Sequence, residues 1–180
     1  RRYQLESAWV WEHQALVRTR VVAGDLALKT SLEALRREVL AMPREQSDLA
    51  SAVCEMRDKM RAEHTASSNS RERFDVKRDP GGIVDIEFVV QYLVLAHASE
   101  HVELTVWSDV IRLLEALEQT GLVTADQAES LSQAYLDYRS ATHSLGLQGC
   151  AAETDVAEFK VQRQQVKQIT EALLPGLQAG

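Results

Sequence analysis

The stretch IVDIEFVVQYLVLAHA, residues 83–98, decides the fold of this chain. Apolar residues lie on almost all sides of it, with no alternation of period two. Its length is more typical of a helix than of a strand, and a helix that is apolar all round is a buried one. We therefore predict that residues 83–98 form a helix that is buried among other helices.

The segments on either side carry the one-sided apolar pattern of amphipathic helices. In residues 26–42, Leu28, Leu32, Leu35 and Val39 recur at spacings of three and four, which is the helical period. The same reasoning predicts further helices over residues 3–22, 47–63, 108–121, 124–145 and 155–174.

Capping residues support several of these boundaries. Asp25 precedes the helix over residues 26–42 and has the side chain of an N-cap. Thr124 with Gln127 has the spacing of a capping box, and Asp155 with Glu158 has it again at the start of the last predicted helix.

The composition excludes an all-β protein. Only 8 glycines and 3 prolines occur in 180 residues, too few for the frequent turns of a sandwich or barrel. We predict an all-α fold, an antiparallel bundle of about six or seven helices, with residues 1–180 as a single domain. Residues 65–70 are small and polar and are predicted to be a loop, and Phe74 and Val76 alternate with charged residues as in extended chain.

The charge and the apolar pattern exclude several classes of function. Lys and Arg total 20 and Asp and Glu total 27, a net charge of −7, which argues against a nucleic-acid or anionic-membrane binder. No run approaches the ~18 apolar residues of a membrane span. Cys54 and Cys150 are far apart, as in a reducing compartment, so we expect a cytoplasmic protein. Arg1 in place of an initiator Met leads us to expect a fragment or a processed chain.

The densest candidate site is the turn before the apolar helix. Lys77 and Arg78 precede the sequence Asp79-Pro80-Gly81-Gly82. Backbone N–H groups of such a turn, together with the positive end of the helix and two cations, have the chemistry of a phosphate cradle. The alternative is a helix-opening turn with solvated charges, and the sequence alone leaves both open.

Asp85 and Glu87 follow in the first turn of the helix. Residues two apart are about 200° apart around a helix axis, so we do not expect these carboxylates to share a metal ion. Asp85 in so apolar a helix would need a backbone or arginine partner if it is buried. Residues 97–101 match the H-x-x-E-H zinc pattern, but they lie at a predicted helix end without a third ligand, so we predict no metal site.

Two segments resemble a known family. Residues 77–88, KRDPGGIVDIEF, resemble the K-x-x-x-G-G-I-x-D-I-E-F signature of the glutamine synthetase adenylyltransferases and, more loosely, the PII uridylyltransferases. Residues 11–25, WEHQALVRTRVVAGD, resemble the W-E-x-Q-A-L-x-R-A-R-x-V-A-G-D stretch that precedes it there. Residues 91–95 and 104–109 look like the C-terminal adenylyltransferase half. Val84 stands where the family often has arginine or a polar residue.

The resemblance implies that a nucleotidyltransferase core lies just before this region. In the family that core uses a Gly-Ser turn and a D-x-D pair that holds Mg²⁺ ions, and it positions ATP for attack by a tyrosine of glutamine synthetase. This chain has neither motif. The resemblance therefore implies the helical domain that follows the core, with no catalytic residue of its own, inactive alone, and with Mg²⁺ and ATP bound by the intact enzyme.

The resemblance also implies a surface that faces the core. It would be formed by the helix that carries Glu12, His13 and Gln14 and by the turn before the apolar helix. The candidate core-facing or phosphate-facing residues are Arg18, Arg20, Lys77, Arg78, Gly81, Gly82, Asp85 and Glu87. The alternative is a regulatory module that binds the PII signal protein, glutamine or glutamine synthetase and takes no part in the chemistry.

Overall fold

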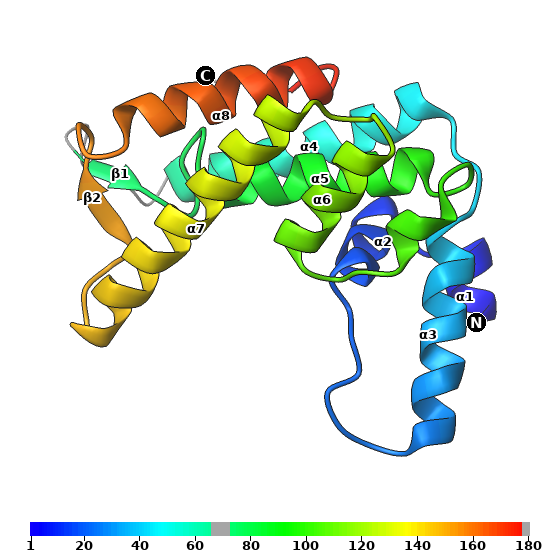
Figure 1. The fold of residues 1–180 in the computed structure, drawn as a ribbon. Helices are drawn as coiled ribbons and strands as arrows, with labels where there is room; N and C mark the ends of the chain where they lie inside the picture. Colours follow the sequence, from blue (N-terminus) through cyan, green and yellow to red (C-terminus); the bar gives the residue numbers. More distant parts are fainter. Residues whose placement is uncertain (66–72, 178–180) are drawn as a thin grey trace.

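The computed structural model describes residues 1–65 and 73–177. In this part of the chain eight α-helices, one 3₁₀-helix and two short strands follow one another (Figure 1). They are α1 (Arg2–Glu6), α2 (Val10–Val17), α3 (Leu26–Leu40), α4 (Gln46–Thr65), β1 (Arg73–Asp75), α5 (Ile83–His97), η1 (Val102–Thr105), α6 (Val110–Gln119), α7 (Ala125–Leu147), β2 (Glu153–Asp155) and α8 (Lys160–Leu173). The predicted helical bundle is confirmed.

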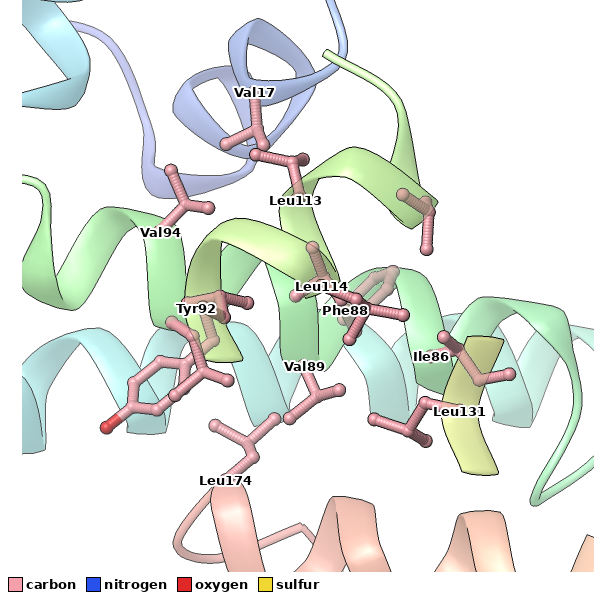
Figure 2. Packing of buried hydrophobic residues seen from close by; sticks show 14 of the residues in the cluster. Val17, Ile86, Phe88, Val89, Tyr92, Val94, Leu113, Leu114, Leu131 and Leu174 are labelled. Carbon is pink, nitrogen blue, oxygen red and sulfur yellow. The ribbon is translucent and has the colours of Figure 1, made fainter. Parts of the chain in front are cut away.

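Helix α5 is the centre of the bundle, as its apolar sequence predicts. Thirteen of its fifteen residues are buried, and it packs against α2, α4, α6, α7 and α8. The core runs from Val17 of α2, which faces Leu113, past Val89 of α5 to Leu174 after α8 (Figure 2). Burial of each such aliphatic side chain contributes about 1.5–3 kcal/mol, so contacts of α5 are the main source of stability.

Two of the predicted caps are present. The Asp25 carboxylate accepts the backbone N–H groups of Ala27 and Leu28 at 2.7 and 3.2 Å. Thr124 and Gln127 form the reciprocal capping box at the start of α7. These side chains satisfy donors that a helix N-terminus leaves without intrahelical partners.

The first predicted helix is divided in two. The segment predicted as one helix over residues 3–22 is interrupted between α1 and α2, where Trp9 has extended dihedral angles. The Glu12 carboxylate accepts the Trp9 N–H at 2.9 Å and the Tyr3 hydroxyl at 2.9 Å. Glu12 thereby caps a new helix start and holds α1 against it, which explains the eighth helix.

A small antiparallel ribbon is the other departure from the prediction. Strands β1 and β2 pair Phe74 with Thr154, so the extended chain expected at Phe74 is confirmed. The last helix starts later than its predicted capping box, because Asp155 ends β2 and its carboxylate accepts the Ala157 N–H instead. Phe74 is fully buried and stacks edge-on against Tyr138 of α7 at 5.9 Å between ring centroids.

Two further expectations can be compared only with the residues that the structure describes. Of the polar stretch predicted as a loop, Thr65 ends α4 and residues 66–70 lie outside the described part. Among the helices that the structure describes, none combines the length and the apolar character needed to cross a lipid bilayer.

A buried arginine joins α2, α3 and η1. Arg36 is only 6% exposed, and its guanidinium donates to the backbone carbonyls of Leu16, Val17, Thr105 and Trp107 at 2.8, 2.7, 2.5 and 2.7 Å. Burial lowers its pKa from the ordinary value of an arginine. The Leu16 carbonyl also accepts the Thr19 N–H at 3.1 Å. At these element ends, where helical hydrogen bonds run out, Arg36 supplies the donors that water would otherwise supply.

A buried histidine holds α1 to α2. The Nε2–H of His13 donates to the Gln4 carbonyl at 2.9 Å, and Nδ1 accepts from Arg44 at 3.3 Å. This arrangement requires the neutral imidazole. Burial, with a smaller effect of the Arg44 charge, lowers the pKa of His13, while Glu12 and the Gln4 hydrogen bond oppose the change. Burial also lowers the pKa of Arg44, to about 10.

Replacement of Arg36 by methionine is expected to lower the free energy of unfolding by about 3 kcal/mol or more. The variant leaves several buried carbonyls without donors, and each such loss costs about 1–3 kcal/mol. Urea unfolding followed by circular dichroism measures the change. The matched control is Arg37→Met, because Arg37 is its exposed neighbour and should change stability by less than about 0.5 kcal/mol. Equal losses in the two variants would contradict the role of Arg36.

Acidification is expected to destabilise the domain through His13. The pKa of His13 is lower in the folded chain than its unfolded value of about 6.5, so the folded state binds fewer protons there. This contribution to stability is complete above the unfolded pKa and is lost as the pH falls through the folded pKa. When the pH falls from about 7 to 5, the urea concentration at the unfolding midpoint should therefore fall less for His13→Gln than for the unaltered protein. The exposed His143→Gln should keep the original pH dependence, and a His13→Gln profile identical to it would refute this role.

Candidate functional site

The Gly-Gly turn before α5 lies under α8. Gly81 has a φ of +82°, and a Cβ on it would lie 2.7 Å from the Arg163 carbonyl oxygen. A Cβ on Gly82 would lie 2.6 Å from the Val76 carbonyl oxygen. Both glycines are buried. They are required because a left-handed conformation and two close backbone approaches meet at this turn.

The N–H groups of this turn are used within the domain. Gly81 donates to the Asp85 carboxylate at 2.6 Å. Ile83 and Val84 donate to the carbonyls of Val76 and Lys77 at 3.0 and 3.1 Å. A phosphate would find none of the N–H groups of Gly81, Gly82, Ile83 or Val84 free in this turn, so the geometry favours the helix-opening alternative. Helical geometry requires these donors to be satisfied, and the chain satisfies them itself.

Asp85 is the buried counterpart of that turn. Its side chain is fully buried and accepts the Arg57 Nε–H at 2.5 Å, with an Arg61 guanidinium nitrogen at 3.3 Å. Arg57 is also buried and donates to the Arg78 carbonyl at 2.8 Å. Burial lowers the pKa of Arg57, and the charge of Asp85 opposes that change. The predicted need for an arginine or backbone partner is confirmed, and both kinds are present.

Glu87 points to the other side of α5, as the helical spacing predicts. It forms an ion pair with Arg18, which lies just after α2, and it accepts the Tyr135 hydroxyl at 3.2 Å. Arg139, one turn further along α7, donates to the same hydroxyl at 3.3 Å. One carboxylate and one phenol therefore connect three elements that are distant in the sequence.

These side chains line a groove between α7, the end of α2 and the start of α5. It consists of two adjoining hollows of about 610 and 620 Å³, and Arg18 and Arg139 line both. We call it the basic groove. Its charged and titratable residues are Arg18, Arg20, Lys77, Glu87, Asp109, Tyr135, Arg139 and His143. Four of these are permanent cations and two are carboxylates, so the groove is locally basic in a chain of net charge −7.

The structure divides the candidate residues into two sets. Arg18, Arg20, Lys77 and Glu87 line the basic groove. Gly81, Gly82 and Asp85 are buried in the α4–α5–α8 contact, and Arg78 does not line either hollow. We expected His13 and Gln14 to lie on the surface that faces the core, but the structure buries both. They are 7% and 4% exposed, and Gln14 donates to Gln91 of α5 at 3.1 Å.

The wall of the groove formed by α7 was not predicted. It contributes Tyr135, Arg139 and His143, which recur every four residues and so share one face of the helix. Arg139 lies over the Tyr135 ring, 5.8 Å from its centroid. The four-residue spacing of Tyr135 and Arg139 indicates that they share a face of α7, but nothing in the sequence shows that this face lines the groove.

The H-x-x-E-H match does not form a metal site. Helix α5 ends at His97, so Glu100 and His101 lie beyond it and do not continue its face. Among the residues that the structure describes, no three His, Cys, Asp or Glu side chains gather as ligands would.

Asp85→Asn is expected to destabilise the domain by about 3–5 kcal/mol, because it leaves the buried Arg57 without a counter-charge. Glu87→Gln is the matched control, since its side chain is 19% exposed and its partner Arg18 is 36% exposed. The control should cost about 1 kcal/mol or less. Chemical denaturation of both variants measures the difference. If Asp85→Asn is as stable as Glu87→Gln, the buried ion pair is not what fixes the start of α5.

Two family models and one curated relative match this chain. A family model described as GlnD PII-uridylyltransferase matches residues 31–173, and one described as glutamate-ammonia ligase adenylyltransferase (GlnE) matches residues 1–35. The chain is 46% identical, over 97% of its length, to a bifunctional glutamine synthetase adenylyltransferase/adenylyl-removing enzyme of Pseudomonas aeruginosa. It spans 19% of the length of that relative. The chain therefore belongs to the family that the GlnD PII-uridylyltransferase model describes, and it is similar to one part of a glutamine synthetase adenylyltransferase.

Proposed function

We propose that this chain is the helical domain that follows the second nucleotidyltransferase core of a glutamine synthetase adenylyltransferase. The intact enzyme would transfer AMP from ATP to a tyrosine of glutamine synthetase, and its other half would remove it. The convergence of two sequence segments on the basic groove carries this proposal. Arg18 and Arg20 come from one family-like segment, Lys77 and Glu87 from the other, and the Arg18–Glu87 pair joins residues 69 apart.

The groove has the chemistry of a surface that receives negative charge from the core. Lys77 and Arg20 have no ionic partner among the described residues, whereas Glu87 holds Arg18 in place. A cation that is already oriented loses less side-chain entropy when it binds a phosphate or a carboxylate. We propose that these side chains contact carboxylates of the core across the domain boundary, or phosphates of its nucleotide.

The metal ions and the nucleotide are assigned to the core. The two carboxylates that line the groove do not fit a Mg²⁺ site, because both already have partners. Glu87 is paired with Arg18, and Asp109 accepts the Arg112 N–H as the N-cap of α6. The domain would therefore support the reaction by position and charge, and by itself it would be inactive.

The alternative is that the helical surface is a regulatory module for the PII signal protein, glutamine or glutamine synthetase. On that proposal the groove would change the response of the enzyme to its regulators and leave the chemistry unaltered. The two proposals therefore differ in the rate of AMP transfer measured without any regulator.

The test is the double variant Arg18→Ala/Lys77→Ala in the full-length adenylyltransferase. We expect kcat/KM for AMP transfer from ATP to glutamine synthetase to fall by more than about threefold, since two groove cations are lost. The control is Arg2→Ala/Lys59→Ala, which removes two exposed cations that do not line the groove. Melting curves of both proteins show whether the fold is kept.

A loss below about threefold without regulators would count against support of catalysis. If the same double variant then failed to respond to PII or glutamine, the regulatory module would replace it. An unchanged rate together with an unchanged response would remove the groove from both proposals.

A further inference from the structure

The N-terminal half of α3 and the turn before it stand away from the bundle. All residues of 22–34 are exposed, and the segment extends beyond the packed helices (Figure 1). We call it the arm. The arm joins the rest of the domain at Leu35, which is half-buried, and Arg36, which is buried. A helical segment with so little packing has little stability in water, because packing supplies most of the stability of protein helices.

The arm carries an apolar stripe that continues the core. Leu28, Leu32 and Val39 lie on the same face of α3, together with Leu35. Val39 is fully buried, Leu32 is 38% exposed and Leu28 is 71% exposed. The face that packs on this domain at one end of α3 is thus uncovered at the other end. The pattern is that of a helix whose contact surface is shared between two bodies.

Exposed apolar side chains are concentrated in the same part of the sequence. Of the fifteen large hydrophobic residues that are exposed in the described chain, seven lie before residue 36. They are Tyr3, Trp9, Trp11, Val22, Leu26, Leu28 and Leu32. A single exposed apolar residue needs no explanation, but four of them lie on the arm itself, which is why we consider the arm a contact surface.

The two family matches divide the chain close to the end of the arm. Residues 1–35 match the adenylyltransferase model, and residues 31–173 match the other one. The arm, residues 22–34, lies within the residues that the adenylyltransferase model matches, so we look for its partner in the rest of an adenylyltransferase. About four fifths of the length of the relative lies outside this chain, which leaves ample polypeptide for the contact.

We infer that the arm is a docking helix for the adenylyltransferase core of the same polypeptide, with Leu28 and Leu32 of the exposed stripe as its apolar contacts. The inference rests on the proposed place of the chain beside that core and names a second contact besides the basic groove. The occupant is apolar and belongs to the same molecule, so the contact does not depend on protein concentration.

The test is hydrogen exchange in the full-length adenylyltransferase. Amides of residues 26–34 should exchange at least tenfold more slowly than in Leu28→Asp/Leu32→Asp. The substitutions are at exposed positions, so the fold of the helical domain itself should survive, and the protection of α5 reports on that. The matched control is Val161→Asp, on an apolar residue of α8 that is 68% exposed and lies outside the arm. It should leave the exchange of residues 26–34 unchanged.

Three outcomes would overturn the inference. The first is rapid exchange of residues 26–34 in the unaltered full-length protein. The second is protection that disappears on dilution, which would indicate a second copy. The third is protection that needs added PII or glutamine synthetase. AMP transfer by the groove variant is measured separately from the exchange of residues 26–34. The groove variant can therefore keep its rate while the arm is protected, and it can lose rate while the arm is unprotected.

Discussion

The carboxylate of Asp85 fixes the place where the central helix begins, and the packing of the other helices depends on that place. The carboxylate accepts hydrogen bonds from the Arg57 guanidinium of α4 and from the Gly81 N–H, and Arg57 also donates to the Arg78 carbonyl. A charge inside so apolar a core is tolerated only with such partners. The turn that they hold together is also the one on which α8 lies, so α4, α5 and α8 are positioned by one cluster.

The D-I-E sequence at the start of α5 serves two purposes because the helix turns about 200° between its two acids. Asp85 is directed into the core and Glu87 into the basic groove. The signature that surrounds them divides in the same way. Gly81 and Gly82 permit the close approach of backbone, whereas Lys77 lies at the groove. A long sequence signature therefore does not mean that all its residues contact a substrate. In this one Gly81, Gly82 and Asp85 hold the turn and the helix that position Lys77 and Glu87.

The sequence predicts the local features of this fold well. The apolar run of α5, the amphipathic stripe of α3 and the caps at Asp25 and Thr124 depend on near neighbours in the chain, and the structure has them. The division of the first helix also has a local cause, the Glu12 carboxylate on the Trp9 N–H, but it competes with an apolar pattern that runs through it.

What the sequence could not provide depends on contacts between distant segments. Arg36 and Arg37 are adjacent and of the same type. Arg36 is buried because its guanidinium donates to four carbonyls, two at the end of α2 and two at or just after the end of η1. Of the groove, two walls were expected from the family resemblance, and the third, with Arg139, depends on how α7 crosses α5. Strand β2 likewise exists because β1 lies beside it.

The position of α8 in the chain affects how the domain is made. A ribosome produces the elements in sequence order, and α8 with Leu174 is the one that closes the core over the Gly81 turn. Until the residues of α8 emerge from the exit tunnel, the nascent chain carries the apolar helix α5 with the side that α8 covers still exposed. During that interval a molecular chaperone would recognise this domain more readily than at any later stage of its life.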